Sequence, residues 1–577
     1  MIGKKLTCTE GKHTVEVFVG NSEGLPSIYV IGEVIKSDPT WEVSNFLQTK
    51  QVGYSDRYTK LFQNPNKLYY ATNTVLPAEI KEIDGGTLYD FGRAINGKLE
   101  LDWLATDIEQ VTLCYGESAT EARDVEMCYY KQEGVTKDSL IRKRAFRYIF
   151  IPGVKEGSIG LIAKHEFYPR SHRAKWKSDQ KRIDQIWRVA QTTFDLCSDW
   201  FFIDGIKRDR WIWAGDAYQA NFINQYLNFD EETDKRTILA LRGHDEVKQN
   251  LNTIVDYSIL WVISVYNHYM MTGDREFLAQ VFSKMKSMMD YLMDQTDENG
   301  FIYERPGDWI FVDWSEIDKE GPTAAEQLFL VAGYQALVAC GKVLGLKVSN
   351  YQKEAERLLE NTLKYFWDEG KGCFIDSYQS GKSHVSRHPN ILAVIFDLVS
   401  EERQQQILNN VLLNDEITQI TTPYFKFFEQ DALCKLGKVD QVLDTINTYW
   451  GGMLDQGATT FWEEYDAAKK GAQHYEMYGD RYGKSLCHAW GASPLYLLGK
   501  YYVGLRPLEP GYQSFEICPR LDSFKEVECT LPVKGGQITI TKNDGMIRVV
   551  STRPGGKIVV GKDSKELPAN EVVEMTI

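Results

Sequence analysis

The sequence predicts a multidomain α and β protein with a central (α/α)6 barrel, an N-terminal β-sandwich and a small C-terminal β-domain. The chain has 577 residues, which is too long for one hydrophobic core. Strand-like and helix-like patterns fill separate stretches instead of alternating. The helix-like stretch contains an even number of segments with mostly short links, as paired helices require. We therefore expect domains at 1–172, 173–504 and 505–577.

The first domain is expected to be β throughout. Short runs of β-branched and aromatic residues are separated by Gly, Pro, Asn and Asp, and no long segment of helical period interrupts them. A jelly-roll-like sandwich is the natural arrangement for such a series. The clearest runs are 13–19, 26–34, 99–105, 109–117 and 144–153.

The second domain is expected to contain twelve helices. Asp179 and Asn350 are suited to begin helices, Gly345 to end one, and residues 272–274 to separate two. Twelve helices with short links suggest six hairpins, which can close into a ring with one helix of each hairpin inside. The expected helices are 179–197, 213–227, 230–243, 253–272, 275–295, 323–346, 350–367, 388–399, 401–413, 422–437, 439–452 and 484–503.

The third domain returns to a β pattern from about residue 505. Its strongest local signal is the turn Asn543-Asp544-Gly545, which lies between two strand-like runs. An Asp-Gly pair between such runs is typical of a tight hairpin.

Composition argues against several classes of function. The net charge of −15 disfavours nonspecific binding to nucleic acid or anionic membranes. The apolar stretch 254–271 is interrupted by Asp256, Asn267 and His268, as in a buried helix and not a membrane span. The N-terminus lacks the apolar core of a secretory signal, and the ten cysteines include no Cys-x-x-Cys pair. We expect a cytoplasmic protein with reduced thiols, no metal and no required cofactor.

The segment 204–216 combines carboxylates, cations and indoles in a way that a folding core does not use. Carboxylates are rarely buried without partners. A sugar-cleaving pocket does need this combination, because indoles stack on sugar rings, Arg and Asp hold hydroxyls, and one carboxyl donates a proton. The residues concerned are Asp204, Lys207, Arg208, Asp209, Arg210, Trp211, Trp213 and Asp216.

A second acidic motif, 457–466, places Trp462 beside Glu463 and Glu464. Two separated carboxylate motifs are what a glycosidase requires, one for the acid and one for the base. Trp309 and Trp314, each next to an Asp, are further candidates for the walls of a sugar pocket.

These motifs resemble the signatures of the α-L-rhamnosidases, glycoside hydrolase family 78. Residues 204–217 resemble the first signature, 457–466 the second, and 485–491 the block that carries the family histidine, here His488. The flanking sequences also resemble the family's β-domains, so the resemblance covers nearly the whole chain. Those flanks are 90–93, 115–118, 144–148 and 507–512.

The resemblance implies an inverting mechanism in which Asp209 is the general acid and Glu463 the general base. Glu464 is a competing base, because sequence alone does not orient neighbouring side chains. Without the resemblance, Asp209 also fits a solvated salt bridge, and Asp216 fits a helix cap. The residues implied in substrate binding are Asp204, Arg208, Trp213, Asp216, Trp309, Trp314, Trp462 and His488.

Two departures from the family pattern bear on substrate identity. The family's acid is usually Glu, one methylene longer than Asp209, and Gly205-Ile206 replaces the usual Cys-Pro. The expected activity is removal of terminal α-L-rhamnose from a small glycoside, such as a flavonoid rutinoside or a rhamnose disaccharide. The alternatives are an inverting (α/α)6 hydrolase for another glycoside and a catalytically inactive sugar-binding protein. A homodimer is left open.

Overall fold

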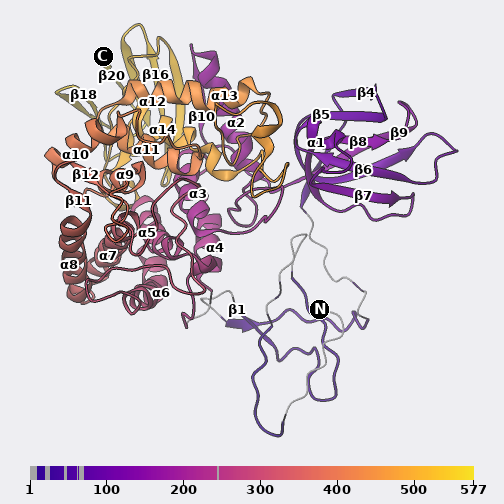
Figure 1. Ribbon diagram of the computed structural model, residues 1–577, viewed down its shortest axis with the longest axis horizontal. Coiled ribbons are helices and arrows are strands. Elements are labelled where there is room, and N and C mark those ends of the chain that lie inside the picture. Colours follow the sequence, from indigo (N-terminus) through magenta and orange to yellow (C-terminus); the bar gives the residue numbers. More distant parts are fainter. Residues whose placement is uncertain are drawn as a thin grey trace. The chain divides into compact units, whose positions relative to one another are not determined.

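The computed structural model describes residues 9–17, 19, 26–44, 49–60, 63, 70–243 and 246–576. The chain forms two compact units, 1–72 and 73–577, which are considered separately (Figure 1). Within its described residues, the first unit has one short antiparallel pair, β1 (Glu42–Ser44) with β2 (Thr49–Gln51). The expected strands at 13–19 and 26–34 are wrong in all their described residues; Phe18 lies outside these. A strand-like pattern without a partner strand gains no ladder of hydrogen bonds.

A seven-stranded sheet follows in the order β3-β9-β5-β8-β6-β7, with β4 paired to β5, and strands β4 to β9 pair antiparallel. The long β5 pairs with β8 along its first half and with β9 along its second, and its register shifts between Asp90 and Ile95. Alternate residues of these strands pack into one apolar core. The bounds are β3 (Ala71–Val75), β4 (Glu79–Ile83), β5 (Gly86–Trp103), β6 (Val111–Gly116), α1 (Ala119–Arg123), β7 (Tyr130–Val135), β8 (Arg144–Pro152) and β9 (Ile159–Phe167).

Each of the twelve expected helical segments contains helix. The π-helical turns η2 (Leu408–Leu412), η3 (Ile446–Trp450) and η6 (Leu498–Tyr502) extend three of them, and the short η5 (Ala489–Ala492) opens the last. The helices are α2 (Lys181–Leu196), α3 (Ala214–Leu227), α4 (Glu231–Arg242), α5 (Val255–Thr272), α6 (Arg275–Met293), α7 (Ala324–Leu344), α8 (Ser349–Phe366), α9 (Arg387–Ile395), α10 (Glu401–Ile407), α11 (Pro423–Lys435), α12 (Val439–Thr445), α13 (Gly451–Asp455) and α14 (Pro494–Leu497).

Some of the expected helix boundaries are correct and others are wrong. Gly345 ends α7 in a left-handed conformation, and Gly273 ends α5 in the same way. Asp179 does not cap α2; its carboxylate instead accepts the Lys525 and Glu526 backbone N–H groups. Asn350 lies inside α8, which begins at Ser349. The Asp179 cap failed because backbone N–H groups far away in the chain use its carboxylate.

Helices that alternate along the chain differ in burial. Helices α3, α5, α7 and α11 are buried on nearly every side, whereas α2, α6 and α8 are buried on one face only. A helix that is apolar all round lies inside a protein, and an amphipathic helix covers a surface. In the described part of the chain, α7 alone is long and apolar enough to be a candidate membrane span, and 72% of its apolar window is buried in the protein.

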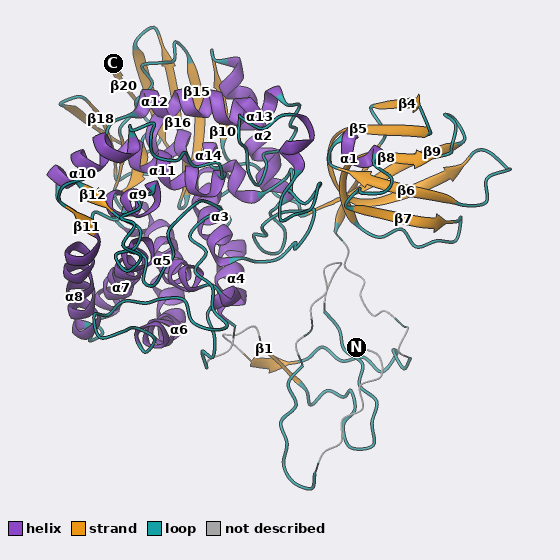
Figure 2. Ribbon diagram, in the orientation of Figure 1, coloured by secondary structure: helices purple, strands orange, loops and turns teal. Residues whose placement is uncertain are grey.

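The C-terminal residues form two small sheets (Figure 2). The predicted hairpin is confirmed, since Asp544 and Gly545 link β16 to β17 with positive φ. The first sheet also takes β10 from the segment before α2, where Trp176 stacks on Trp187. One sheet contains β10 (Lys175–Ser178), β15 (Val527–Val533), β16 (Gly536–Asn543), β17 (Met546–Ser551) and β20 (Val572–Thr576); the other contains β13 (Leu505–Pro507), β14 (Phe515–Ile517), β18 (Gly556–Val560) and β19 (Asp563–Leu567).

Candidate active site

The loop between α2 and α3 carries the first acidic motif and is closed by its own backbone. The Asp204 N–H donates to the Trp211 carbonyl at 3.0 Å, and the Trp211 N–H donates to Asp204 Oδ1 at 2.8 Å. Between them, Asp209 and Arg210 both have positive φ, at 35° and 51°. Two successive non-glycine residues in this region are costly, and such strain often occurs at functional sites.

Glu463 lies in the loop after α13, and its carboxylate accepts three hydrogen bonds. Oε1 accepts from Arg208 Nη2 at 2.5 Å and from the Tyr478 hydroxyl at 2.7 Å, and Oε2 accepts from the Ser485 N–H at 2.9 Å. A carboxylate has about four acceptor positions, so one remains on Oε2. Arg208, which the sequence suggested for substrate binding, thus joins the first acidic motif directly to the second.

The charges around Glu463 keep it ionised despite its burial. Burial alone would raise its pKa, but the charges of His488 and Arg208 and the Ser485 and Tyr478 hydrogen bonds oppose this. Together they hold the pKa of Glu463 below its usual value. A carboxylate that remains ionised at neutral pH can act as a base.

Asp204, Asp216 and His488 form a buried group beside Glu463. His488 Nε2 lies 3.0 Å from Asp216 Oδ1, and the Tyr257 hydroxyl lies 3.5 Å from Asp216 Oδ2. Burial raises the pKa of Asp204 to about 7 although His488 opposes it, and burial also raises the pKa of Asp216. Asp216 and nearby carboxylates raise the pKa of His488 against the effect of its burial. Ionisable groups with shifted pKa values that lie this close together are typical of functional sites.

The structure distinguishes Glu463 from Glu464. The Glu464 carboxylate pairs with the ammonium groups of Lys469, at 2.9 Å, and Lys484. Of the two neighbours, Glu463 contacts Arg208 and interacts with the charge of His488. The geometry therefore favours Glu463 as the base and gives Glu464 an ion-pairing role.

Three of the predicted aromatic residues are half-exposed and lie near this group. Trp309 and Trp314 are each 37% exposed, with ring centroids 5.5 Å apart. The ring centroids of Trp314 and Tyr478 are 5.0 Å apart, and the Tyr478 hydroxyl donates to Glu463. Trp213 immediately precedes α3 and packs edge-on to Tyr257. These rings offer apolar faces close to polar groups, which suits a sugar.

Trp462 is placed differently from the other predicted aromatic residues. It is 2% exposed and packs edge-on against Tyr465, His474 and Tyr475. An indole enclosed in this way has no free face on which a sugar could stack. We assign Trp462 to packing behind Glu463 and not to substrate contact.

Asp209 is exposed at the strained turn, next to the Arg208 that holds Glu463. It differs in this respect from the buried Asp204 and Asp216, which flank it in sequence. An exposed carboxyl next in sequence to Arg208 is accessible to a substrate, whereas Asp204 Oδ1 accepts the Trp211 N–H. The structure therefore brings Arg208, Asp204, Asp216, His488 and Glu463 together and leaves Asp209 at the edge of the group.

Tyr478 is a residue of this group that the sequence motifs did not indicate. Its hydroxyl donates to Glu463, and the Arg208 guanidinium lies 4.2 Å from its ring centroid. It has positive φ in a tight turn, where Met477 and Asp480 exchange backbone hydrogen bonds. The turn sequence Tyr-Gly-Asp was a weak signal, and nothing local connected it with Glu463.

Gly215 in the first motif has a steric role that yields a testable prediction. A Cβ at this position would lie 2.3 Å from the Tyr257 ring and 2.7 Å from the Tyr424 hydroxyl. We expect Gly215→Ala to reduce the free energy of unfolding by about 1–3 kcal/mol, the usual cost of overpacking. Thermal unfolding measures the effect, with Gly53→Ala as the control, because a Cβ at Gly53 meets no atom within 4 Å. Equal midpoints for the two variants would contradict this account.

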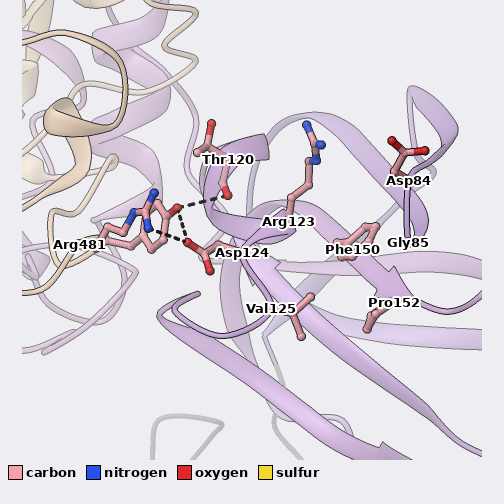
Figure 3. Close-up of a pocket in the computed structure, with 10 residues that line it drawn as sticks. Asp84, Gly85, Thr120, Arg123, Asp124, Val125, Phe150, Pro152 and Arg481 are labelled. Atoms are coloured by element: carbon pink, nitrogen blue, oxygen red, sulfur yellow. Dashed lines mark hydrogen bonds and ion pairs between the residues drawn. The ribbon is translucent and has the colours of Figure 1, made fainter.

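A separate cavity of about 420 Å³ lies where the β-sheet region meets the helical region. Figure 3 shows Arg481 pointing to Asp124, with Arg123 and Asp84 standing apart from this contact. The Tyr482 hydroxyl donates to Asp124 Oδ2 at 3.0 Å. None of the predicted site residues lines this cavity.

A helical fold with two acidic loops joined by Arg208 and with half-exposed indoles agrees with the class of 6 hairpin glycosidase domains that this chain matches. Residues 171–502 match the bacterial alpha-L-rhamnosidase 6 hairpin glycosidase domain, and residues 2–151 match the Bacteroidetes alpha-rhamnosidase-like N-terminal domain. The chain belongs to the bacterial α-L-rhamnosidase family.

Individual relatives agree with this family. An alpha-L-rhamnosidase of an Alteromonas species is 25% identical over 517 residues, covering 81% of this chain and 54% of the relative. A GH78 rhamnosidase structure from Bacillus sp. GL1 has a TM-score of 0.69 at 23% identity, covering 84% of this chain and 54% of that one. A rhamnose-bound rhamnosidase from Klebsiella oxytoca has a TM-score of 0.64 at 20% identity, and the match covers 75% of this chain and 96% of that one. The chain thus spans about half the length of the curated relative.

Proposed function

We propose that this protein is a glycoside hydrolase that removes terminal α-L-rhamnose from small rhamnosides. The observation that carries the proposal is the direct bond from Arg208, in the first acidic motif, to Glu463, in the second. Arg208 directly precedes the candidate acid Asp209, so its bond to the candidate base Glu463 supports their convergence on one substrate. Family membership supports the choice of sugar, as does the rhamnose in the Klebsiella oxytoca structure.

In the proposed mechanism, Glu463 acts as the general base and Asp209 as the general acid. Glu463 Oε2 takes a proton from a water that attacks the anomeric carbon, while Arg208, Tyr478 and Ser485 hold the carboxylate. Asp209 protonates the leaving oxygen from the opposite face. Inversion requires the two carboxyl groups to be about 6.5–9.5 Å apart, with room for that water.

The remaining residues of the group would bind the sugar. Asp204, Asp216 and His488 would face its hydroxyls, while Trp309 and Trp314 would cover its apolar face. An Asp whose pKa is about 7 is partly protonated near neutral pH, so Asp204 can both donate and accept. No step of this chemistry requires a cofactor.

We also propose that the helices close into an (α/α)6 barrel at 173–504, between β-domains at 1–172 and 505–577. The alternation of buried and amphipathic helices supports the inner and outer rings. A cytoplasmic location is a further proposal. The nine described cysteines support it, because all are free thiols, including the close pair Cys197 and Cys487.

The experiment that tests the function is hydrolysis of an aryl α-L-rhamnoside followed by proton NMR. We expect β-L-rhamnose to be the first product, because the water attacks the face opposite the leaving group. Initial α-L-rhamnose would contradict inversion. A panel of other aryl glycosides is the control. Preferred turnover of another sugar would support a different inverting hydrolase, and rhamnose binding without turnover would support an inactive binder.

A further inference from the structure

The β-sheet region reaches the candidate base through a pair of glutamates that follow β6. The Ser118 hydroxyl caps α1 by accepting the Glu121 N–H at 3.1 Å, and the Glu121 carboxylate accepts the Glu117 N–H at 3.0 Å. This local turn presents both carboxylates to the same side. The Glu117 and Glu121 side chains are only 6% and 3% exposed. Two such carboxylates remain buried only where cations or N–H groups satisfy them.

One set of contacts from this pair runs through Lys207. The Lys207 ammonium lies 2.8 Å from Glu121 and 3.7 Å from Glu117, and it donates to the Lys484 carbonyl at 3.2 Å. The next residue along the chain is Arg208, which donates to Glu463. A single peptide unit therefore separates the cation held by the sheet region from the cation that holds the base.

A second set of contacts runs through the segment 485–486. The Leu486 N–H donates to Glu117 Oε2 at 2.7 Å, and the adjacent Ser485 N–H donates to Glu463 Oε2 at 2.9 Å. The Glu463 N–H donates in turn to the Ser485 carbonyl at 3.0 Å, and the Thr460 hydroxyl donates to the Leu486 carbonyl at 2.6 Å. The two successive N–H groups of this segment therefore bind different carboxylates, Ser485 that of Glu463 and Leu486 that of Glu117.

We propose that Glu117 is a positioning residue, which fixes the direction of Glu463 Oε2 by holding the Leu486 N–H on the far side of the segment. This inference rests on the proposed function, in which Oε2 takes the proton from the attacking water. The sheet region then supplies part of the active-site architecture and is more than a separate module. Displacing a base by about 1 Å can lower the rate by about 100-fold, so a contact that fixes its position has a large effect on turnover.

The charged groups around Glu117 are consistent with this role. Burial raises its pKa to about 7, Lys207 opposes the rise, and Glu121 and Glu463 add to it. Because the hydrogen bond uses a carboxyl oxygen as acceptor, an amide oxygen of the same length can replace it. The contact and the charge can therefore be separated by substitution.

The experiment compares Glu117→Gln with Glu117→Asp in the full chain. Gln keeps the length and the acceptor but loses the charge, whereas Asp keeps the charge and withdraws the acceptor by one methylene. We expect Glu117→Asp to lower kcat by about 10-fold to 100-fold, with KM changed by less than about threefold, and Glu117→Gln to retain most of the activity. The reverse order, or equal losses in the two variants, would overturn the proposal.

Arg147→Met is the matched control. Arg147 also connects the sheet region to the helical region, donating to the Gly457 carbonyl at 3.2 Å, but its contacts among the described residues, with Asp90, Tyr148 and Gly457, include neither Glu463 nor the segment 485–486. We expect its loss to affect thermal stability and to leave kcat of the folded enzyme unchanged. A kcat loss equal to that of Glu117→Asp would show that any contact between the two regions matters, and would overturn the specific role.

Hydrogen exchange tests this inference independently of the proposed function. The Leu486 amide should exchange faster in Glu117→Asp than in the wild type, and at an unchanged rate in Glu117→Gln. Exchange is read without substrate, so it tests the contact even if aryl rhamnosides are not hydrolysed. Unchanged exchange in Glu117→Asp would overturn the inference, whereas failure of the wild type to hydrolyse any rhamnoside would overturn only the function.

Discussion

Glu463→Gln is expected to lower kcat of rhamnoside hydrolysis by about 10²-fold to 10⁴-fold, the usual contribution of a general base. Gln has the same length, and its oxygen can still accept from Arg208 and Tyr478, whereas its NH2 group cannot accept the Ser485 N–H; with two of the three bonds kept, the fold around it should survive. What it loses is the ability to take a proton from water. Steady-state kinetics with an aryl α-L-rhamnoside measure the effect, and circular dichroism confirms folding.

The pH profile supplies a second readout for the same variant. The pKa of Glu463 lies below its usual value of 4.5, so the base stays ionised on acidification to about that pH. Any loss of wild-type kcat/KM that comes from protonating Glu463 should therefore appear only below about pH 4.5, and Gln should remove it. By linkage, this carboxylate stabilises the fold above the pKa of the unfolded chain, and the contribution is lost as pH falls through the folded pKa.

Glu464→Gln is the neighbouring control. Its loss would leave Lys469 and Lys484 without their shared carboxylate, so we expect reduced stability. Turnover by the folded fraction should remain within a few-fold of the wild type, by the usual distinction between catalytic and structural groups. A larger kcat loss in Glu464→Gln than in Glu463→Gln would reverse the assignment of the base.

Asp209→Asn is expected to produce the other large effect, and its size should depend on the leaving group. A general acid matters most when the leaving oxygen is a poor one. We expect a loss of about 10²-fold to 10⁴-fold for rhamnose disaccharides and a smaller loss for nitrophenyl rhamnoside, which needs little protonation. Parallel kinetics on the two substrates measure the difference.

Asp209→Glu is the matched variant, because Glu is the residue that the family usually has here. If Asp209→Glu turns over as fast as the wild type or faster, the shorter Asp209 carboxyl acts as the same general acid as the family's Glu, from a turn of different shape. If Asp209→Asn lost activity equally on both substrates, the acid would have to be sought elsewhere. Asp204, with a pKa raised by burial to about 7, would be the next candidate.

Local patterns predicted most of the elements because they depend on near neighbours. Helical spacing of apolar residues placed twelve helices, and glycines marked where α5 and α7 end. The same reasoning failed for 26–34, where β-branched residues found no partner strand. It also could not place β10, whose partner β15 lies about 350 residues later.

The sequence by itself determined the acidic motifs, the helical and β stretches and the family, because residue identity and spacing are properties of the chain. The tertiary structure alone decided which way each side chain points. It turned Glu463 toward Arg208 and Glu464 toward two lysines, enclosed Trp462, and brought Tyr478 to Glu463 and Glu117 to the neighbouring Leu486. These outcomes depend on contacts between residues far apart in the chain, and local periodicity carries no information about such contacts.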